Sequence, residues 1–149
     1  MKSSRRLGPV AKLAKQRERN AASHLGDSLR QADLQQKQLD DLINYRDEYV
    51  AGFKAAGKAG LSSVQLRDYQ VFLSRLDSAI LQQQQKLVAS RQDCQQSQAQ
   101  WQDEHGHSNM IDKAVEKRRQ AENRRQDELE QREQDDRPRG SVNIEDPKA

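Results

Sequence analysis

Large side chains that could fill a core are scarce in this sequence. It contains one Trp, three Tyr and two Phe, and its mean hydropathy is −1.17. The core of an α/β enzyme or a β-sandwich requires far more aromatic and aliphatic volume than this. The composition therefore excludes those classes, and it leaves either a disordered polar chain or long helices that bury one narrow seam.

Proline distinguishes these two classes. Its three copies, Pro9, Pro138 and Pro147, leave the stretch from Val10 to Arg137 without any. Proline removes an amide donor and clashes with the preceding turn, so its absence is typical of helix interiors. A disordered chain of this length would usually be richer in proline and would lack a helical period. We therefore expect long helices.

Cysteine and long apolar runs are also nearly absent. The single cysteine, Cys94, excludes a disulfide framework and a Cys-based zinc site. No apolar stretch approaches the ~20 residues that span a bilayer, and a net charge of +3 is only a weak indication of nucleic-acid binding. These features predict a cytoplasmic protein with no transmembrane segment, no cofactor and no metal.

A stripe of apolar residues at helical spacing predicts a first helix over about residues 8–53. Glycines then cluster within residues 52–60, which predicts a sharp turn over about 54–61. Ser62 can accept a hydrogen bond from the Gln65 amide while the Gln65 side chain bonds back to the Ser62 amide. This capping box predicts that a second helix begins near residue 62.

The second helix carries an unbroken heptad repeat of apolar residues, the pattern of a coiled-coil seam. Reversal of the chain at the turn places the two helices antiparallel, with Leu7 expected opposite the region of Ile111. Cys94 and Trp101 are interpreted as seam residues whose side chains pack between the two helices. The predicted core consists of Leu25, Leu29, Leu39, Ile43, Leu66, Leu73, Ile80, Leu87, Cys94 and Trp101.

These patterns together predict an all-α fold. We expect a single coiled-coil domain over residues 1–149, formed by a long antiparallel two-helix coiled coil (a helical hairpin) with one arm extended. The second helix is expected to run over about 62–135, past the end of the first, and residues 138–149 are expected to form a disordered tail.

Patterns for catalysis or metal binding are weak. No Ser/His/Asp arrangement, phosphate-binding glycine loop or carboxylate pair lies in a predicted pocket, and two paired helices offer no concave site for a small molecule. The His105-Gly106-His107 segment suggests metal binding, but two His ligands on one helix face require i, i+4 spacing. We interpret the segment as a polar kink, and we expect neither enzymatic activity nor a small-molecule substrate.

Two alternative functions come from the basic N-terminus and the heptads. The stretch Arg19–Ser23 is similar to the basic region of a leucine-zipper DNA-binding protein, but Asn20 directly abuts the Ala pair and the basic charge stops before the leucines. These departures argue against nucleic-acid binding. The alternatives to a docking protein are therefore a basic-region coiled-coil DNA-binding protein and a self-associating structural coiled coil.

Apolar residues remain near the turn after the seam has been assigned. A two-stranded coil has one seam and cannot fully bury a second stripe on each helix. This surplus indicates either a locally wide core or self-association face, or a docking patch for another protein, where aromatic anchors concentrate. The second stripes are Gln38, Leu42, Tyr45 and Tyr49 on the first helix, and Phe72, Leu76, Ala79 and Gln83 on the second.

Two segments near the turn resemble the FliJ family of soluble flagellar export proteins. They are residues 42–49 (LINYRDEY) and 69–80 (YQVFLSRLDSAI), and the resemblance covers the chain to about residue 115. It implies an antiparallel coiled coil similar to the central stalk of rotary ATPases. It further implies a non-enzymatic component of the flagellar type III protein export apparatus, cytoplasmic and peripherally associated with the inner membrane.

The resemblance also implies partners and site residues. The partners are a flagellar export ATPase (FliI-like) hexamer, a membrane export gate protein (FlhA-like) and export chaperones. The family's gate-binding patch falls on Gln38, Leu42, Tyr45, Tyr49, Phe72, Leu76 and Ala79, and Gln83 stands where a histidine is expected. We hypothesise that basic residues at the end entering the ATPase ring meet acidic side chains of its pore. These residues are Arg5, Arg6, Lys12, Lys15, Arg17 and Arg19.

Overall fold

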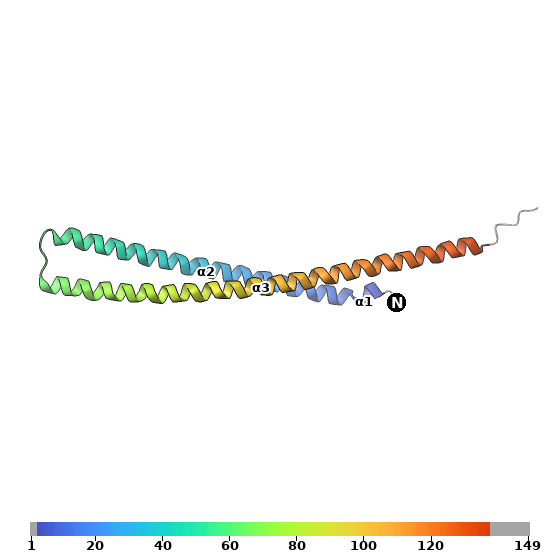
Figure 1. The fold of residues 1–149 in the computed structure, drawn as a ribbon, viewed down its shortest axis with the longest axis horizontal. Coiled ribbons are helices and arrows are strands. Elements are labelled where there is room, and N and C mark those ends of the chain that lie inside the picture. Colours follow the sequence, from blue (N-terminus) through green and yellow to red (C-terminus); the bar gives the residue numbers. More distant parts are fainter. Residues whose placement is uncertain (1–2, 138–149) are drawn as a thin grey trace, which may run out of the picture. The chain divides into compact units, whose positions relative to one another are not determined.

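The computed structural model of the protein describes residues 3–137. Three helices make up nearly all of this part of the chain: α1 (Ser3–Arg6), α2 (Gly8–Gly57) and α3 (Ser63–Asp136), as Figure 1 shows. No strand occurs among the described residues. The predicted tail at 138–149 lies outside them.

The chain divides into two compact units. The turn unit consists of Arg17–Glu104, and the terminal unit consists of Met1–Gln16 together with His105–Ala149. Both long helices contribute to both units, because α2 begins in the terminal unit and α3 ends in it. Organisation of the chain as one domain stays a prediction.

In the turn unit, α2 and α3 are antiparallel neighbours (Figure 1). Next to the loop that joins them, the rings of Phe53 and Tyr69 stack with centroids 3.4 Å apart. Toward the other end of this unit, Ser28 Oγ and Ser97 Oγ are 2.8 Å apart. The predicted all-α helical hairpin is therefore confirmed.

The loop contains the predicted capping signal. The helix α2 ends at Gly57 rather than near residue 53, and Gly60 has φ +91°, a conformation that favours glycine. The Ser62 amide donates to Gln65 Oε1 at 2.9 Å, and the Gln65 amide donates to Ser62 Oγ at 3.1 Å. This reciprocal pair satisfies two amides that a helix start leaves unpaired, so the predicted capping box is confirmed.

The seam between the helices follows alternating steps of three and four residues on both sides, as in a coiled coil. Every residue on these two lines is buried or half-buried. On α2 the line within the turn unit is Ala21, Leu25, Ser28, Ala32, Gln35, Leu39, Leu42, Arg46, Tyr49 and Phe53. On α3 it is Tyr69, Leu73, Leu76, Ile80, Gln83, Leu87, Ser90, Cys94, Ser97, Trp101 and Glu104.

Three predicted core residues lie outside this seam. Leu29 is 52% exposed, Ile43 36% and Leu66 44%. Steps of three and four bring the neighbours Ser28 and Leu42 inward, which turns Leu29 and Ile43 outward by one position. Leu66 lies before Tyr69, the residue at which the seam line of α3 begins. Of the other predicted core residues, Leu39 and Leu87 are buried, and Leu25, Leu73, Ile80, Cys94 and Trp101 are half-buried.

Polar side chains fill much of the seam on α3. Gln83 is buried and donates from Nε2 to the backbone oxygen of Gln35 at 3.0 Å and to its Oε1 at 2.6 Å. Buried Ser97 bonds to Ser28, and the Cys94 thiol lies 3.0 Å from the Ser28 carbonyl oxygen. These hydrogen bonds offset the cost of burying polar groups between the helices.

In the terminal unit, α1 and the start of α2 contact α3. The Ser4 amide and hydroxyl donate to the two carboxylate oxygens of Glu122 at 3.0 and 2.7 Å. Lys15 forms an ion pair with Asp112, with Nζ and Oδ2 separated by 3.1 Å. Beyond Glu122, α3 continues to Asp136.

These contacts correct the predicted register of the two helices. Leu7 lies between Ser4 and Lys15 in sequence, and its position therefore pairs with a part of α3 later than Ile111. The prediction assumed that the chain reverses at residues 58–60. The loop instead continues to Ser62, which moves the partners of the first helix toward the C-terminal end of α3.

Ser108 offers a direct test of the polar seam. Its side chain is fully buried in the terminal unit, and its hydroxyl has no hydrogen-bond partner. Ser108→Ala should raise the free energy of unfolding by about 1 kcal/mol, because it removes an unsatisfied buried hydroxyl. The matched change Ser97→Ala should lower it by about 1 kcal/mol, because Ser28 then loses its partner. Thermal unfolding followed by circular dichroism measures both, and equal effects of the two changes would contradict this account of the seam.

Candidate docking site

An aromatic cluster forms where α2 and α3 approach the loop. The rings of Tyr49 and Tyr69 stack with centroids 5.3 Å apart and planes inclined by 15°. Phe72 is tilted against Tyr49 at 4.6 Å and meets Tyr45 edge to face at 6.2 Å. Together with the pair of Phe53 and Tyr69, these contacts form a continuous chain of rings across the helix pair, each pair adding to the stability that burial alone provides.

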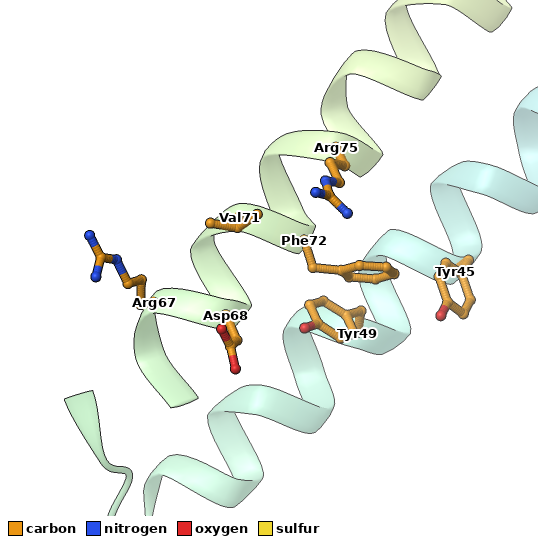
Figure 2. A pocket seen from close by; sticks show the side chains of 7 residues that line it. All are labelled: Tyr45, Tyr49, Arg67, Asp68, Val71, Phe72 and Arg75. Atoms are coloured by element: carbon orange, nitrogen blue, oxygen red, sulfur yellow. The ribbon is translucent and has the colours of Figure 1, made fainter. Parts of the chain in front are cut away.

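Two grooves meet at Tyr45. The first has a volume of about 600 Å³ and includes Tyr45, Tyr49 and Phe72 in its lining. Figure 2 shows Phe72 extending from α3 toward the two tyrosines of α2. The second groove, of about 510 Å³, is lined by Gln38, Asp41, Leu42, Tyr45 and Gln83. Tyr45 lines both grooves and is 50% exposed.

The predicted gate-binding residues are thus brought together in one part of the turn unit, but they are not equally accessible. Leu76 is only 7% exposed because it lies on the seam, and Leu42 and Tyr49 are half-buried on the same lines. Gln38 and Tyr45 are exposed. The surplus stripe predicted from spacing is therefore partly seam and partly surface.

Charged residues border the first groove, and sequence reasoning did not single them out. Asp68 and Arg75 lie one turn before and one turn after Phe72 on α3 (Figure 2). Their i−4 and i+3 spacing from Phe72 is the signal that could have identified them. Across the seam, Arg46 Nε and Asp77 Oδ1 are 2.6 Å apart, and this hydrogen bond raises the pKa of the Arg46 guanidinium.

The predicted ATPase-binding residues fall into both units. Arg17 and Arg19 belong to the turn unit, whereas the others belong to the terminal unit. Lys15 is half-buried by its ion pair with Asp112. The remaining members of the set, Arg5, Arg6, Lys12, Arg17 and Arg19, are exposed.

Other candidate sites can be assessed within residues 3–137. No group of three or more metal-ligating side chains occurs there, and α3 continues as helix through His105-Gly106-His107. Within the same residues, no helix is long and apolar enough to cross a bilayer.

Comparisons with known proteins identify similarity over most of the chain. The sequence model of a family described as "Flagellar FliJ protein" matches residues 2–138. The Flagellar FliJ protein of Escherichia coli (strain K12) is 33% identical over 81 residues, which are 54% of this chain and 55% of that protein. The chain therefore spans about half the length of this relative. No solved structure gives a significant match.

The unequal burial of the patch gives a test of which residues hold the fold. Leu76→Ala should lower the free energy of unfolding by about 2–4 kcal/mol, because it leaves a cavity in the seam. Tyr45→Ala should lower it by about 1 kcal/mol or less, because it removes a half-exposed ring with one edge-to-face contact. Urea denaturation measures both values. If Tyr45→Ala were as destabilising as Leu76→Ala, Tyr45 would belong to the core.

Proposed function

Because the chain belongs to the FliJ family of flagellar proteins, we propose that it is a non-enzymatic component of the flagellar type III protein export apparatus. It binds the hexameric export ATPase (FliI-like) through basic residues near its N-terminus, and it binds the membrane export gate protein (FlhA-like) through the turn unit. It links these two and also engages export chaperones. It acts in the cytoplasm, in peripheral association with the inner membrane.

The observation that carries this proposal is the chemical difference between the two candidate surfaces. An aromatic patch with two grooves lies in the turn unit, and most of the predicted ATPase-binding cations lie in the terminal unit. A protein that links two partners needs two surfaces that cannot substitute for one another. Aromatic grooves and exposed cations meet that need, because they select partners of different chemistry.

The aromatic patch has the properties of a protein-docking surface. Tyr45 is half exposed beside two grooves, and its ring meets that of Phe72, which in turn packs against Tyr49. Large rings of this kind act as interface anchors when a partner covers them. Asp68 and Arg75 at the border can add charged contacts that fix orientation.

The basic segment has the properties of a surface for an acidic partner. Residues 4–16 contain four Lys or Arg and no Asp or Glu. Of these cations, Lys15 is paired with Asp112, while Arg5, Arg6 and Lys12 are exposed. Exposed like charges steer association with an oppositely charged surface and speed it at low salt.

Reversal of the exposed basic charges tests the ATPase contact. The triple change Arg5→Glu, Arg6→Glu and Lys12→Glu should weaken binding to the export ATPase by at least tenfold and abolish any stimulation of ATP turnover, because attraction becomes repulsion. Titration of the cognate ATPase with each protein, measuring turnover and oligomer size, gives the result. The control is Lys37→Glu, Lys54→Glu and Lys86→Glu, three exposed cations of the turn unit. Unchanged binding by the first variant would refute this contact.

A second experiment tests the gate contact independently. Tyr45→Ala should reduce binding to the cytoplasmic part of the gate protein by about tenfold or more, as loss of an aromatic anchor does, with helicity unchanged. Isothermal titration calorimetry measures the affinity. Val88→Ala is the control, since Val88 is also exposed on the turn unit but lines neither groove. Equal losses in both variants would refute the docking role of the patch.

A further inference from the structure

Within the terminal unit, the basic residues of α3 cluster over residues 113–125, ahead of an acidic run over residues 127–136. Residues 105–125 contain six Lys or Arg against three carboxylates. All six basic side chains are exposed. They are Lys113, Lys117, Arg118, Arg119, Arg124 and Arg125.

Helical spacing gathers most of these cations on one face. With about 100° between successive residues of an α-helix, Lys113, Lys117 and Arg124 fall within about 40° of one another around the axis. Arg118 and Arg125 flank them on one side. The carboxylates at 112, 116 and 122 fall outside the sector of about 140° that holds all five cations, and Glu128 falls within it. This sector is called the cationic face below.

The three carboxylates of residues 105–125 are engaged elsewhere. Asp112 pairs with Lys15, Glu122 accepts two hydrogen bonds from Ser4, and Glu116 accepts one from Gln120. Among residues 3–137, no hydrogen bond or ion pair is formed by any of the five cations. Within residues 105–128, Glu128 is the one carboxylate in this sector, so the cationic face keeps an excess of positive charge. Its five cations are not used to hold the helices together.

We propose that the cationic face binds the surface of a bilayer that contains anionic lipids. Cations on one side of a straight helix segment can all contact a flat anionic surface at once. The described part of the terminal unit has no Phe, Tyr or Trp that could stack on a base. Its one strongly exposed apolar side chain on this face is Met110, which is 71% exposed. Binding is therefore electrostatic and at the headgroup level, without insertion of an apolar face.

The strength of this interaction follows from the number of cations. Each Lys or Arg held near an anionic membrane surface multiplies binding by about fivefold at low salt, and the effect falls off within a Debye length. Removal of three cations should therefore lower vesicle binding by about a hundredfold. Added salt should release the protein from the vesicles.

The test is co-sedimentation of the full chain with vesicles. One set contains phosphatidylglycerol and phosphatidylcholine in equal parts, and the other contains phosphatidylcholine alone. The wild-type protein should bind only the anionic set. Lys113→Gln, Lys117→Gln and Arg124→Gln together should lose about a hundredfold in binding. The control, Lys37→Gln, Lys54→Gln and Lys86→Gln, has the same net charge and should retain most of it.

Several outcomes would overturn the proposal. One is failure of the wild-type chain to bind anionic vesicles, and another is equal loss in both triple variants, which would indicate net charge rather than this face. Binding to duplex DNA that exceeds vesicle binding at the same salt, and that is lost in the first variant only, would assign the face to nucleic acid. Circular dichroism checks that each variant is helical. The assay contains neither ATPase nor gate protein, so its result is independent of the proposed export function.

Discussion

A helix that has only one partner must place everything it buries on a single line, and the turn unit is built around that constraint. The lines on α2 and α3 advance by alternating steps of three and four residues, so side-chain size decides how closely the helices approach. Small residues such as Ala32, Ser90 and Ser97 allow close approach in one part, and Phe53 and Tyr69 fill a wider gap near the loop. Variation in seam volume along the hairpin therefore follows directly from the residue at each step.

This variation in width explains where the candidate docking surface forms. Rings that are too large to be covered by a single partner helix leave part of their area exposed, as Tyr45 does, and grooves remain on either side. The same crowding of large side chains therefore stabilises the region near the loop and leaves apolar surface for another protein. In the terminal unit charged side chains take the place of aromatic rings, with a basic stretch over residues 113–125 followed by an acidic one over residues 127–136.

Much of this fold could be predicted from the sequence, because its signals are local. The capping box at Ser62 and Gln65 and the glycine-rich turn depend on neighbouring residues alone. The seam was predicted less well, since the prediction equated burial with apolarity. It chose Leu29 over the adjacent Ser28, although hydrogen bonding to Ser97 makes the serine the inward residue. The partition of the patch into seam and surface could not be predicted either, because it depends on the register between helices, which the loop length shifts.

The contact between Gln83 and Gln35 has a consequence for alignment. A heptad seam repeats itself, so sliding one helix by seven residues would exchange one set of similar contacts for another. Gln83 is the only glutamine on the α3 line of the turn unit and Gln35 the only one on the α2 line, and they meet across the seam. A slip of seven residues in either direction would place one of the two amides opposite a leucine, Leu76 or Leu42, which cannot pair with it. The hydrogen-bonded pair of Gln83 and Gln35 thus favours the native register over registers shifted by one heptad. The neighbouring seam positions need not specify the register, so they can be small, polar or aromatic.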